Sequence, residues 1–395
     1  MSGLISKRMP RPNRIRRRLL AGLLAGSAAS SVTASVTASV AARVATPAKD
    51  SNRPEYPVVK RGVPLRFPQD HGAHPDYRTE WWYVTGWLQS GTDAALGFQI
   101  TFFRSRPQID PRNPSRFAAR ELVLAHSALS DPKLRTLVHD QRTARAGFEL
   151  AGARTGDTEV WIDDWRLSRS GADGNSRYLA SLPGSRLALD LAFASTQPIL
   201  LHGDAGFSQK GPRPQQASYY YTQPQLAVSG KVAYDGRARE VTGRAWLDHE
   251  WSSEILGSDA TGWDWIGINL DDGGALMAFR IRDRAGRSLW ASGSWRERGG
   301  KTRDFGAASV LFTALRSWRS ARTGTTYPVA MRVELGTSGS RETIELSPLF
   351  DDQELDARSS TGIVYWEGAV TATRDGRQIG SGYLELTGYH SPLAL

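Results

Sequence analysis

The chain has 395 residues, of which 40% are hydrophobic, and it contains 13 tryptophans and no cysteine. This length suits two domains with cores of their own, and the lack of cysteine excludes disulfides, thiol catalysis and zinc–thiolate sites. The net charge of +10 would suggest nucleic-acid binding, but nine basic residues and only one acidic residue fall within residues 1–50. The rest of the chain is therefore nearly neutral, and we predict no nucleic-acid partner.

The first 46 residues have the layout of an export signal. A basic run at residues 14–18 precedes a weakly hydrophobic stretch at residues 19–29 and a series of small residues. Residues 16–20 (RRRLL) resemble the twin-arginine pattern, although Ile15 stands where that pattern usually has Ser or Thr. We predict a twin-arginine-like signal and linker over residues 1–46, and a periplasmic or secreted protein without a transmembrane segment in its mature chain. The alternative is a disordered basic arm.

Beyond residue 60 the sequence is typical of short strands separated by Gly, Asp and Asn turns. The expected strands cover residues 81–88, 96–103, 122–129, 160–167, 187–193, 226–234, 241–247, 263–270, 275–281, 328–335, 343–346, 364–373 and 381–386. Many of them alternate apolar and polar residues, which is the period of a sheet with one buried face. Residues 307–319 are the best candidate for a helix.

An internal repeat predicts how the strands are organised. When the sequence is shifted against itself by 181 positions, Trp82 aligns with Trp263, Gly86 with Gly267, Phe98 with Phe279 and Ile100 with Ile281. In the same order, residues 235–237 (DGR) recur at 375–377 as the turn of a second hairpin. We therefore predict an all-β fold of two tandem lipocalin-like antiparallel barrels, one over residues 60–255 and one over residues 256–395. A single large β-sandwich is the alternative.

The first candidate site cluster lies at residues 71–83, where two histidines, several charged groups and four aromatic residues surround the start of a strand. A carboxylate buried there, such as that of Glu80, must be paired or must keep its proton to a raised pH. Glu80 is thus either a general acid or substrate anchor at a barrel mouth, or a partner of Arg78 or Arg104 that locks the barrel end. We assign His74 and Trp82 from this cluster to substrate binding.

The second cluster is residues 245–251 (AWLDHEW). Alternation puts Asp248 and Glu250 on one face of a strand and His249 on the other, beside Trp251. Two carboxylates on one face can share a proton, which raises one pKa and supplies an acid near neutral pH. The alternative is a salt-bridge network at the junction of the two domains.

A third set comprises Tyr220, within residues 218–221 (SYYY), and His126. These side chains either hold a polar head group in a cavity or pack at its rim. Four histidines, at positions 71, 74, 126 and 249, could meet Asp248 as a metal site, but their spacing does not demand one, and we predict neither metal nor cofactor. The phosphate-binding loop, the dinucleotide fingerprint, the zinc-protease motif and the Gly-x-Ser-x-Gly elbow do not occur in the sequence.

Several of these segments resemble the family that includes the AttH proteins and the carotenoid 1,2-hydratases. The resemblance is carried by residues 70–75 (DHGAHP), 79–86 (TEWWYVTG), 97–103 (GFQITFF), 125–126 (AH), 220–224 (YYTQP), 243–251 (GRAWLDHEW) and 365–368 (YWEG). It implies two lipocalin-like barrels in an exported protein, and ABC-type permease components as partners in some members. The signal segment and residues 248–250 are more similar to the exported AttH branch than to the carotenoid enzymes.

The hydratase branch adds water across a terminal isoprenoid double bond without a cofactor. Such chemistry needs a strong acid, aromatic faces that shelter a cation, and a held water. The resemblance implies the following roles: Asp248 or Asp264 as the acid, Trp251, Trp263 and Trp265 as the shelter, and His249 as the group that orients water. Related lipocalin-like proteins catalyse pericyclic or isomerising reactions instead.

Two classes of function follow from this sequence. The first is an enzyme of hydratase or hydrolase type that acts on an apolar, lipid-like or isoprenoid-like molecule. The second is a non-catalytic periplasmic carrier or an accessory of an ABC-type transporter. A carboxylate of Asp248 that points into a tunnel would favour chemistry, whereas one pinned by arginines at the barrel junction would favour a structural role.

Overall fold

The computed structural model describes residues 54–110, 112–337 and 339–393 of the chain. The predicted export signal at residues 1–46 lies outside the described residues. The described part is all-β and belongs to one compact unit. Within these residues, no helix is long and apolar enough to cross a membrane.

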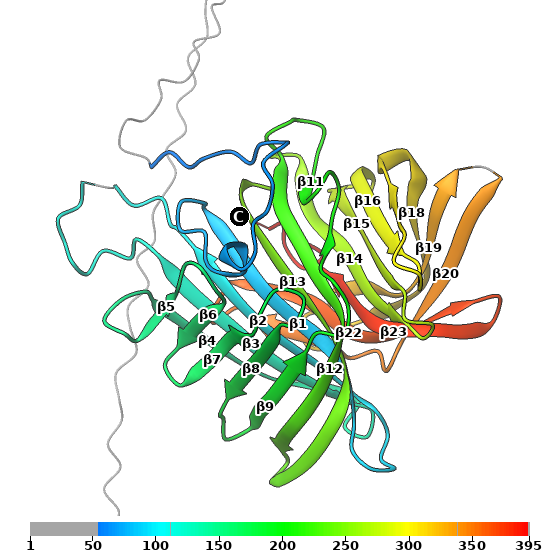
Figure 1. Cartoon of the computed structure of the whole chain (residues 1–395). Coiled ribbons are helices and arrows are strands. Elements are labelled where there is room, and N and C mark those ends of the chain that lie inside the picture. The colour runs from blue at the N-terminus through cyan, green and yellow to red at the C-terminus, as the bar shows by residue number, and fades with distance from the viewer. Residues whose placement is uncertain (1–53, 111, 338, 394–395) are drawn as a thin grey trace, which may run out of the picture. The chain divides into compact units, whose positions relative to one another are not determined.

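The strands form two antiparallel sheets, one of 13 strands and one of 10 strands in the described residues (Figure 1). The first sheet contains β1 (Thr79–Gln89), β2 (Leu96–Ser105), β3 (Leu122–Asp131), β4 (Thr136–Arg145), β5 (Ala151–Ala153), β6 (Glu159–Ile162), β7 (Trp165–Ser170), β8 (Arg177–Leu182), β9 (Leu187–Ala194), β10 (Leu200–Leu201), β11 (Phe207–Gln209), β12 (Ala217–Tyr234) and β13 (Arg237–Glu254). The second contains β14 (Ala260–Leu270), β15 (Ala275–Asp283), β16 (Ser288–Arg296), β17 (Thr302–Phe305), β18 (Val310–Arg319), β19 (Thr326–Thr337), β20 (Ser340–Pro348), β21 (Glu354–Ala357), β22 (Ile363–Arg374) and β23 (Arg377–Leu386). Two 3-10 turns, η1 (Gln69–His71) and η2 (Ala307–Ser309), accompany them.

The two sheets share one strand order. The first runs β4-β3-β2-β1-β13-β12 before it continues to β9, and the second runs β17-β16-β15-β14-β23-β22 before it continues to β20. The closing hairpins β12–β13 and β22–β23 turn at residues 235–236 and 375–376, all four at the positive φ that such two-residue turns require. The predicted all-β fold with two lipocalin-like sheets is confirmed, and the domain boundary near residue 255 stays a prediction.

The individual residue pairs of the predicted repeat are out of register by one position. Trp82 and Phe98 belong to the core of the first sheet, whereas Trp263 and Phe279 lie on the opposite face of theirs, outside the core of the second sheet. The counterpart of Trp263 is therefore Trp81, which joins the same cluster between the sheets. A slip of one residue reverses the face of every side chain in a strand, so the pairing of Trp82 with Trp263 was wrong.

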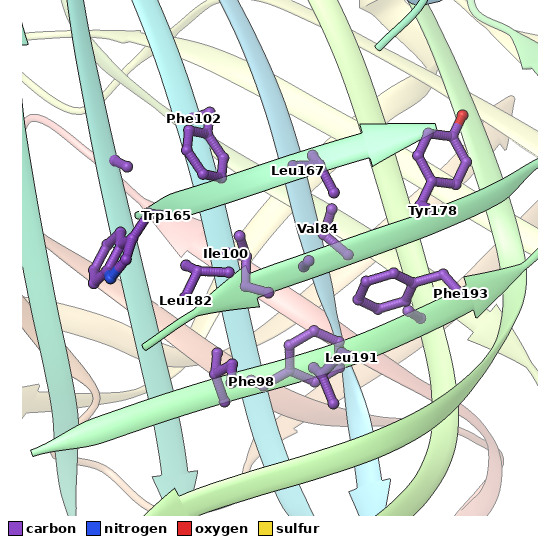
Figure 2. Packing of buried hydrophobic residues seen from close by; sticks show 14 of the residues in the cluster. Val84, Phe98, Ile100, Phe102, Trp165, Leu167, Tyr178, Leu182, Leu191 and Phe193 are labelled. Carbon is purple, nitrogen blue, oxygen red and sulfur yellow. The ribbon is translucent and has the colours of Figure 1, made fainter. Parts of the chain in front are cut away.

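Each sheet curls around its own filled core. In the first sheet, β3 and β4 approach β6 and β9, so that the sheet nearly closes into a barrel. Figure 2 shows Phe98 and Ile100 of β2 and, across that interior, Trp165 of β7 with Leu191 and Phe193 of β9. Burial of one such side chain stabilises the fold by about 1.5–3 kcal/mol. The second sheet curves similarly, and β15 and β16 approach β18 around a separate core.

The helix predicted at residues 307–319 was wrong. Only Ala307–Ser309 form a 3-10 turn, and Val310–Arg319 form β18, which pairs with β19. Val310 and Phe312 are buried on one face of β18 and Leu311 is exposed between them. This alternation together with the pairing to β19 outweighs the helix propensity of the Ala, Leu and Arg residues in the segment.

Polar contacts join the outer faces of the two sheets. A register shift in β12 between Gln223 and Leu226 frees the backbone of Gln225, whose N–H donates to Asn269 Oδ1 on β14 at 2.7 Å. The Asn269 amide in turn donates to the carbonyl of Ala245 on β13 at 3.1 Å. These bonds fix β14 against the middle of β12 and β13. They therefore determine which side chains of the two sheets face each other along the rest of these strands.

Candidate active site

The last residues of β13 build two different environments, one on each face of the strand. Asp248 and Glu250 point to the second sheet and line a cavity there. His249 and Trp251 point the other way, where His249 stacks on Trp82 with ring centroids 4.7 Å apart. Strand alternation predicted that Asp248 and Glu250 lie on one face of the strand and His249 on the other. The register of β13 places them in this way.

The cavity has a volume of about 350 Å³ and lies between the two sheets. Its aromatic wall consists of Trp81, Tyr83, Phe103, Trp263, Trp265, Phe279 and Tyr365. Its acidic side chains include Asp248, Glu250, Glu367 and Glu385. The first three are buried, and Glu385 is partly buried. Because carboxyl groups are costly to ionise in such surroundings, this arrangement favours groups that keep a proton near neutral pH.

Asp248 is held by three donors. Trp246 Nε1 donates to Oδ1 at 2.7 Å, the Tyr220 hydroxyl donates to Oδ2 at 2.7 Å, and the Thr222 hydroxyl also donates to Oδ1. Burial raises the pKa of Asp248 to about 7, against the opposing effect of these three bonds. The Tyr220 hydroxyl accepts from Trp265 Nε1 at 3.0 Å, so Asp248 also positions one aromatic wall of the cavity.

Glu250 is paired with a lysine that sequence reasoning missed. Lys210 Nζ lies 2.8 Å from Glu250 Oε1, and the Ser218 hydroxyl donates to the same oxygen. The ammonium group also lies over the rings of Tyr220 and Phe279, at 4.6 and 4.1 Å from their centroids. Glu250 and Lys210 therefore form a buried, internally neutralised pair in the wall.

Glu367 on β22 and Glu385 on β23 are the other two acids of the cavity. Burial and the nearby charge of Glu385 raise the pKa of Glu367 well above its ordinary value. Burial raises the pKa of Glu385 to about 7, opposed by a hydrogen bond from Trp263 Nε1 at 2.8 Å. The Tyr83 hydroxyl of the first sheet donates to Glu367 Oε1.

Glu80 lies at the centre of a separate, fully buried network on the other face of the first sheet. Its carboxylate binds Arg104 Nε at 2.8 Å, His74 Nδ1 at 2.8 Å and His249 Nε2 at 2.9 Å. Burial opposes ionisation, but the bonds from His249 and His74 and the charge of Arg104 hold the pKa of Glu80 below its ordinary value. Of the two predicted alternatives for Glu80, this geometry matches the pairing with Arg104.

His74, Glu80 and His249 are also the group that could hold a metal ion, since one ligand atom of each lies within 4.8 Å of the others. In the structure the Glu80 carboxylate already accepts from both histidines and from Arg104. The guanidinium of Arg104 would repel a cation at this position. We therefore describe the group as a structural hydrogen-bond network.

The remaining predicted residues lie outside the cavity wall. Asp264 is on the opposite face of β14 from Trp263 and Trp265, where Arg280 Nε at 2.6 Å and Arg282 Nε at 2.8 Å neutralise it. His126 lies behind the wall, where Tyr365 and Ser360 each bond one of its ring nitrogens at 2.8 Å. Burial lowers the pKa of His126 to about 3, so it is neutral near pH 7.

Trp82, Trp251 and His74 likewise pack on the inner side of the first sheet. His74 stacks on Trp251 with centroids 3.6 Å apart. The structure thus brings Asp248, Glu250, Trp263 and Trp265 together at the cavity, with Tyr220 directly behind them. It separates His74, His126, His249, Trp82, Trp251 and Asp264 from the cavity wall, and the Glu80 carboxylate is engaged by its own network.

Sequence reasoning missed Tyr83, Lys210, Glu367 and Glu385 as site residues. Glu367 and Glu385 each alternate with core residues of their strands, a pattern that ordinarily indicates a solvent-facing position. The signal available in the sequence was the inclusion of Glu367 in the segment YWEG at residues 365–368. Nothing comparable marked Lys210, which lies in a connection between β11 and β12.

Fold and site together define an all-β protein with two lipocalin-like sheets and an acid-lined, aromatic-walled cavity between them. Residues 58–389 match the family described as AttH-like, which is most of the chain, and the protein belongs to that family. A crystal structure from Nitrosomonas europaea, described as an AttH, shares 51% sequence identity with it. The match covers 85% of this chain and 100% of that one, with a TM-score of 0.78.

Two further crystal structures are similar in fold at low identity. Kievitone hydratase from Nectria haematococca is 13% identical, with a TM-score of 0.62 over 85% of this chain and 96% of its own. CghA with Sch210972 is 14% identical, with a TM-score of 0.50 over 80% of this chain and 90% of its own. No curated protein sequence matches the chain significantly.

Proposed function

We propose that this protein binds a mostly apolar small molecule in the cavity between its sheets and promotes acid-catalysed addition of water to a carbon–carbon double bond. The observation that carries the proposal is the combination of an aromatic wall with buried carboxyl groups whose pKa values are raised, among them Asp248 and Glu385 at about 7. A general acid works best when its pKa lies near the working pH.

The wall suits a reaction that passes through a carbocation. Protonation of an alkene leaves a positive charge on carbon, and the faces of Trp263 and Trp265 can stabilise such a charge by about 0.5–2 kcal/mol each. The likeness to kievitone hydratase is a likeness of fold, and the acids named here are residues of this chain.

One end of the cavity suits an acidic head group on the ligand. Arg78 lines the cavity at the half-exposed start of β1, and its guanidinium makes no ion pair with the residues that the structure describes. Tyr83, which binds Glu367, lies five residues further along β1, about 16 Å away at the rise of a strand. A long apolar chain with a carboxylate would reach from Arg78 to the buried acids.

A non-catalytic carrier is the second candidate, and one observation favours it. The Asp248 carboxylate is fully engaged by Trp246, Tyr220 and Thr222, as a purely structural acid would be. A carrier needs the apolar cavity but no proton transfer. The predicted location outside the cytoplasm and an association with ABC-type permease components are compatible with either function and form part of this proposal.

The test is to recover the protein from the extracytoplasmic fraction of its host and identify the bound molecule by native mass spectrometry. The purified chain is then incubated with farnesol and farnesoic acid in isotopically labelled water. A hydrated product supports the enzyme, whereas binding without product supports the carrier. Leu124→Trp places a bulky side chain in the cavity wall and should abolish binding, while Leu311→Trp at an exposed position should not. Retention of binding in Leu124→Trp would place the ligand elsewhere.

A further inference from the structure

Glu367 and Glu385 lie directly opposite each other on neighbouring strands. The register of β22 and β23 pairs them, and both side chains face the cavity between the sheets. Directly opposed residues in an antiparallel pair have Cβ atoms about 4.5–5.5 Å apart. Glu367 is 0% exposed and Glu385 is partly buried, so the two carboxyl groups share a largely enclosed part of the cavity wall.

Each carboxyl group has one oxygen fixed by a donor from a different strand. The Tyr83 hydroxyl of β1 binds Glu367 Oε1, and Trp263 Nε1 of β14 binds Glu385 Oε2. The second oxygen of Glu367, Oε2, is buried and has no hydrogen-bond partner among the described residues. A buried carboxyl oxygen without a partner is costly, and it indicates a position at which a ligand or a water molecule can bind.

Two carboxylates at this separation cannot both be ionised in a buried site, so the pair keeps one proton. Burial and the charge of Glu385 both raise the pKa of Glu367, and the unengaged oxygen Oε2 gives the shared proton a position on Glu367. The titratable and charged groups around the pair are Asp248, Glu250 and Lys210 of the first sheet, with Tyr83, Tyr365 and Tyr383. Lys210 is neutralised by Glu250, so no unpaired cation among these groups draws the proton away.

The other acids of the region are less suited to proton transfer. Asp248 accepts hydrogen bonds from three donors, so both of its carboxylate oxygens are already engaged. Asp264 faces away from the cavity and binds two arginines. Glu367 alone combines a free oxygen, complete burial and a position in the cavity wall among the described residues.

We propose that Glu367 and Glu385 are the proton-exchanging pair of this site, with Glu367 as the acid that protonates the ligand and Glu385 as the base that receives a proton from water. This assignment rests on the proposed function. It names the catalytic residues within that function, and neither of them was among the candidates that the sequence indicated.

The protons balance over one turnover. Glu367 Oε2–H transfers its proton to one carbon of the double bond, so that a C–H bond forms, the π bond breaks and a cation remains on the neighbouring carbon. Water adds to that cation through a new C–O bond, and the proton it loses passes to the Glu385 carboxylate. The proton then returns from Glu385 to Glu367, and the net change is the addition of one water molecule.

The first experiment compares Glu367→Gln, Glu385→Gln and Asp248→Asn in the hydration assay with farnesoic acid. Loss of a general acid or base typically costs 10²–10⁴-fold in rate. We expect each glutamine variant to lose at least 10²-fold in kcat while it binds farnesoic acid as the wild type does, and Asp248→Asn to lose less. Asp271→Asn, at an exposed position, is the unchanged control. Full activity in Glu367→Gln, or a larger loss in Asp248→Asn than in both glutamine variants, would overturn the assignment.

The second experiment needs no turnover. Infrared spectroscopy of the protein with isotopically labelled glutamate reports protonated carboxyl groups at pH 7. We expect a protonated glutamate signal in the wild type that is lost in Glu367→Gln, because Glu385 alone then ionises more readily. If that signal is missing from the wild type, both glutamates are ionised and the pair is refuted. Absence of product with a positive infrared signal would instead count against the proposed hydration and leave the shared proton established.

Discussion

Replacement of Glu80 by Gln should be among the most destabilising single changes in the first sheet. The Glu80 and Arg104 side chains are both 0% exposed, and Nε of Arg104 lies 2.8 Å from the carboxylate. Gln has nearly the same shape but no charge, and its amide would point donors at donors of Arg104, His74 or His249. Breaking a buried ion pair by removal of one partner costs about 3–5 kcal/mol, because the other charge is left uncompensated. The remaining ion pair of Arg104, with Glu121 at 3.1 Å, involves a partly exposed carboxylate, and the other bonds of Arg104 go to the uncharged backbone carbonyls of His74 and Tyr77.

The measurement is the free energy of unfolding from urea titrations followed by tryptophan fluorescence, with Asp204→Asn as the control. Asp204 pairs with Arg61 at an exposed position, 56% and 59% exposed, so its loss should cost about 0–1 kcal/mol. The pKa of Glu80 is lowered in the folded state, so its contribution is complete above its ordinary value of 4.5 and is lost as the pH falls through the folded-state value. The difference between wild type and Glu80→Gln should therefore be full at pH 7 and shrink below pH 4.5. A cost no larger than that of Asp204→Asn would refute this account of the network.

Two further predictions concern packing and ligand choice. Gly382→Ala should destabilise the second sheet by about 1–3 kcal/mol, because the added Cβ would lie 1.9 Å from the backbone oxygen of Gly267. Gly299→Ala is the control: its added Cβ would contact no other atom within 4 Å, so the urea midpoint should change little. Arg78→Gln should weaken binding of farnesoic acid about 10-fold and leave binding of farnesol unchanged, as measured by isothermal calorimetry, because only the acid has a charge for the guanidinium. Equal losses for both ligands would show that Arg78 acts through the shape of the cavity mouth.

Strand alternation predicted which face of β13 each residue occupies, and the structure agrees at Asp248, His249 and Glu250. The same rule applied to residues 263–265 would have separated Asp264 from its two tryptophan neighbours. The family resemblance instead suggested Asp264 as an acid beside them, but its side chain binds Arg280 and Arg282. The alternation of residues 263–265 therefore contained the information needed to place Asp264 on the other face.

Other features depended on contacts that no single segment encodes. Glu367 receives its bond from Tyr83, more than two hundred residues away, and this bond exists only because the two sheets pack with these faces together. The one-residue error between Trp82 and Trp263 had the same origin, since an ungapped alignment carries no information on which face is buried. Composition and strand pattern therefore determined the fold class, while the acids of the cavity required the docking of one sheet on the other.

The hollow of this molecule lies between the curled sheets, and the interior of each sheet is packed with side chains. Residues that line the cavity are thus carried on the outward-facing positions of strands whose inward-facing positions form the cores of the sheets. A change of ligand can arise by substitution at alternate residues such as Phe103 or Phe279 without any loss of inner packing. The cavity lining of such a fold can therefore change with little effect on its stability, because cavity residues and core residues lie on opposite faces of the same strands.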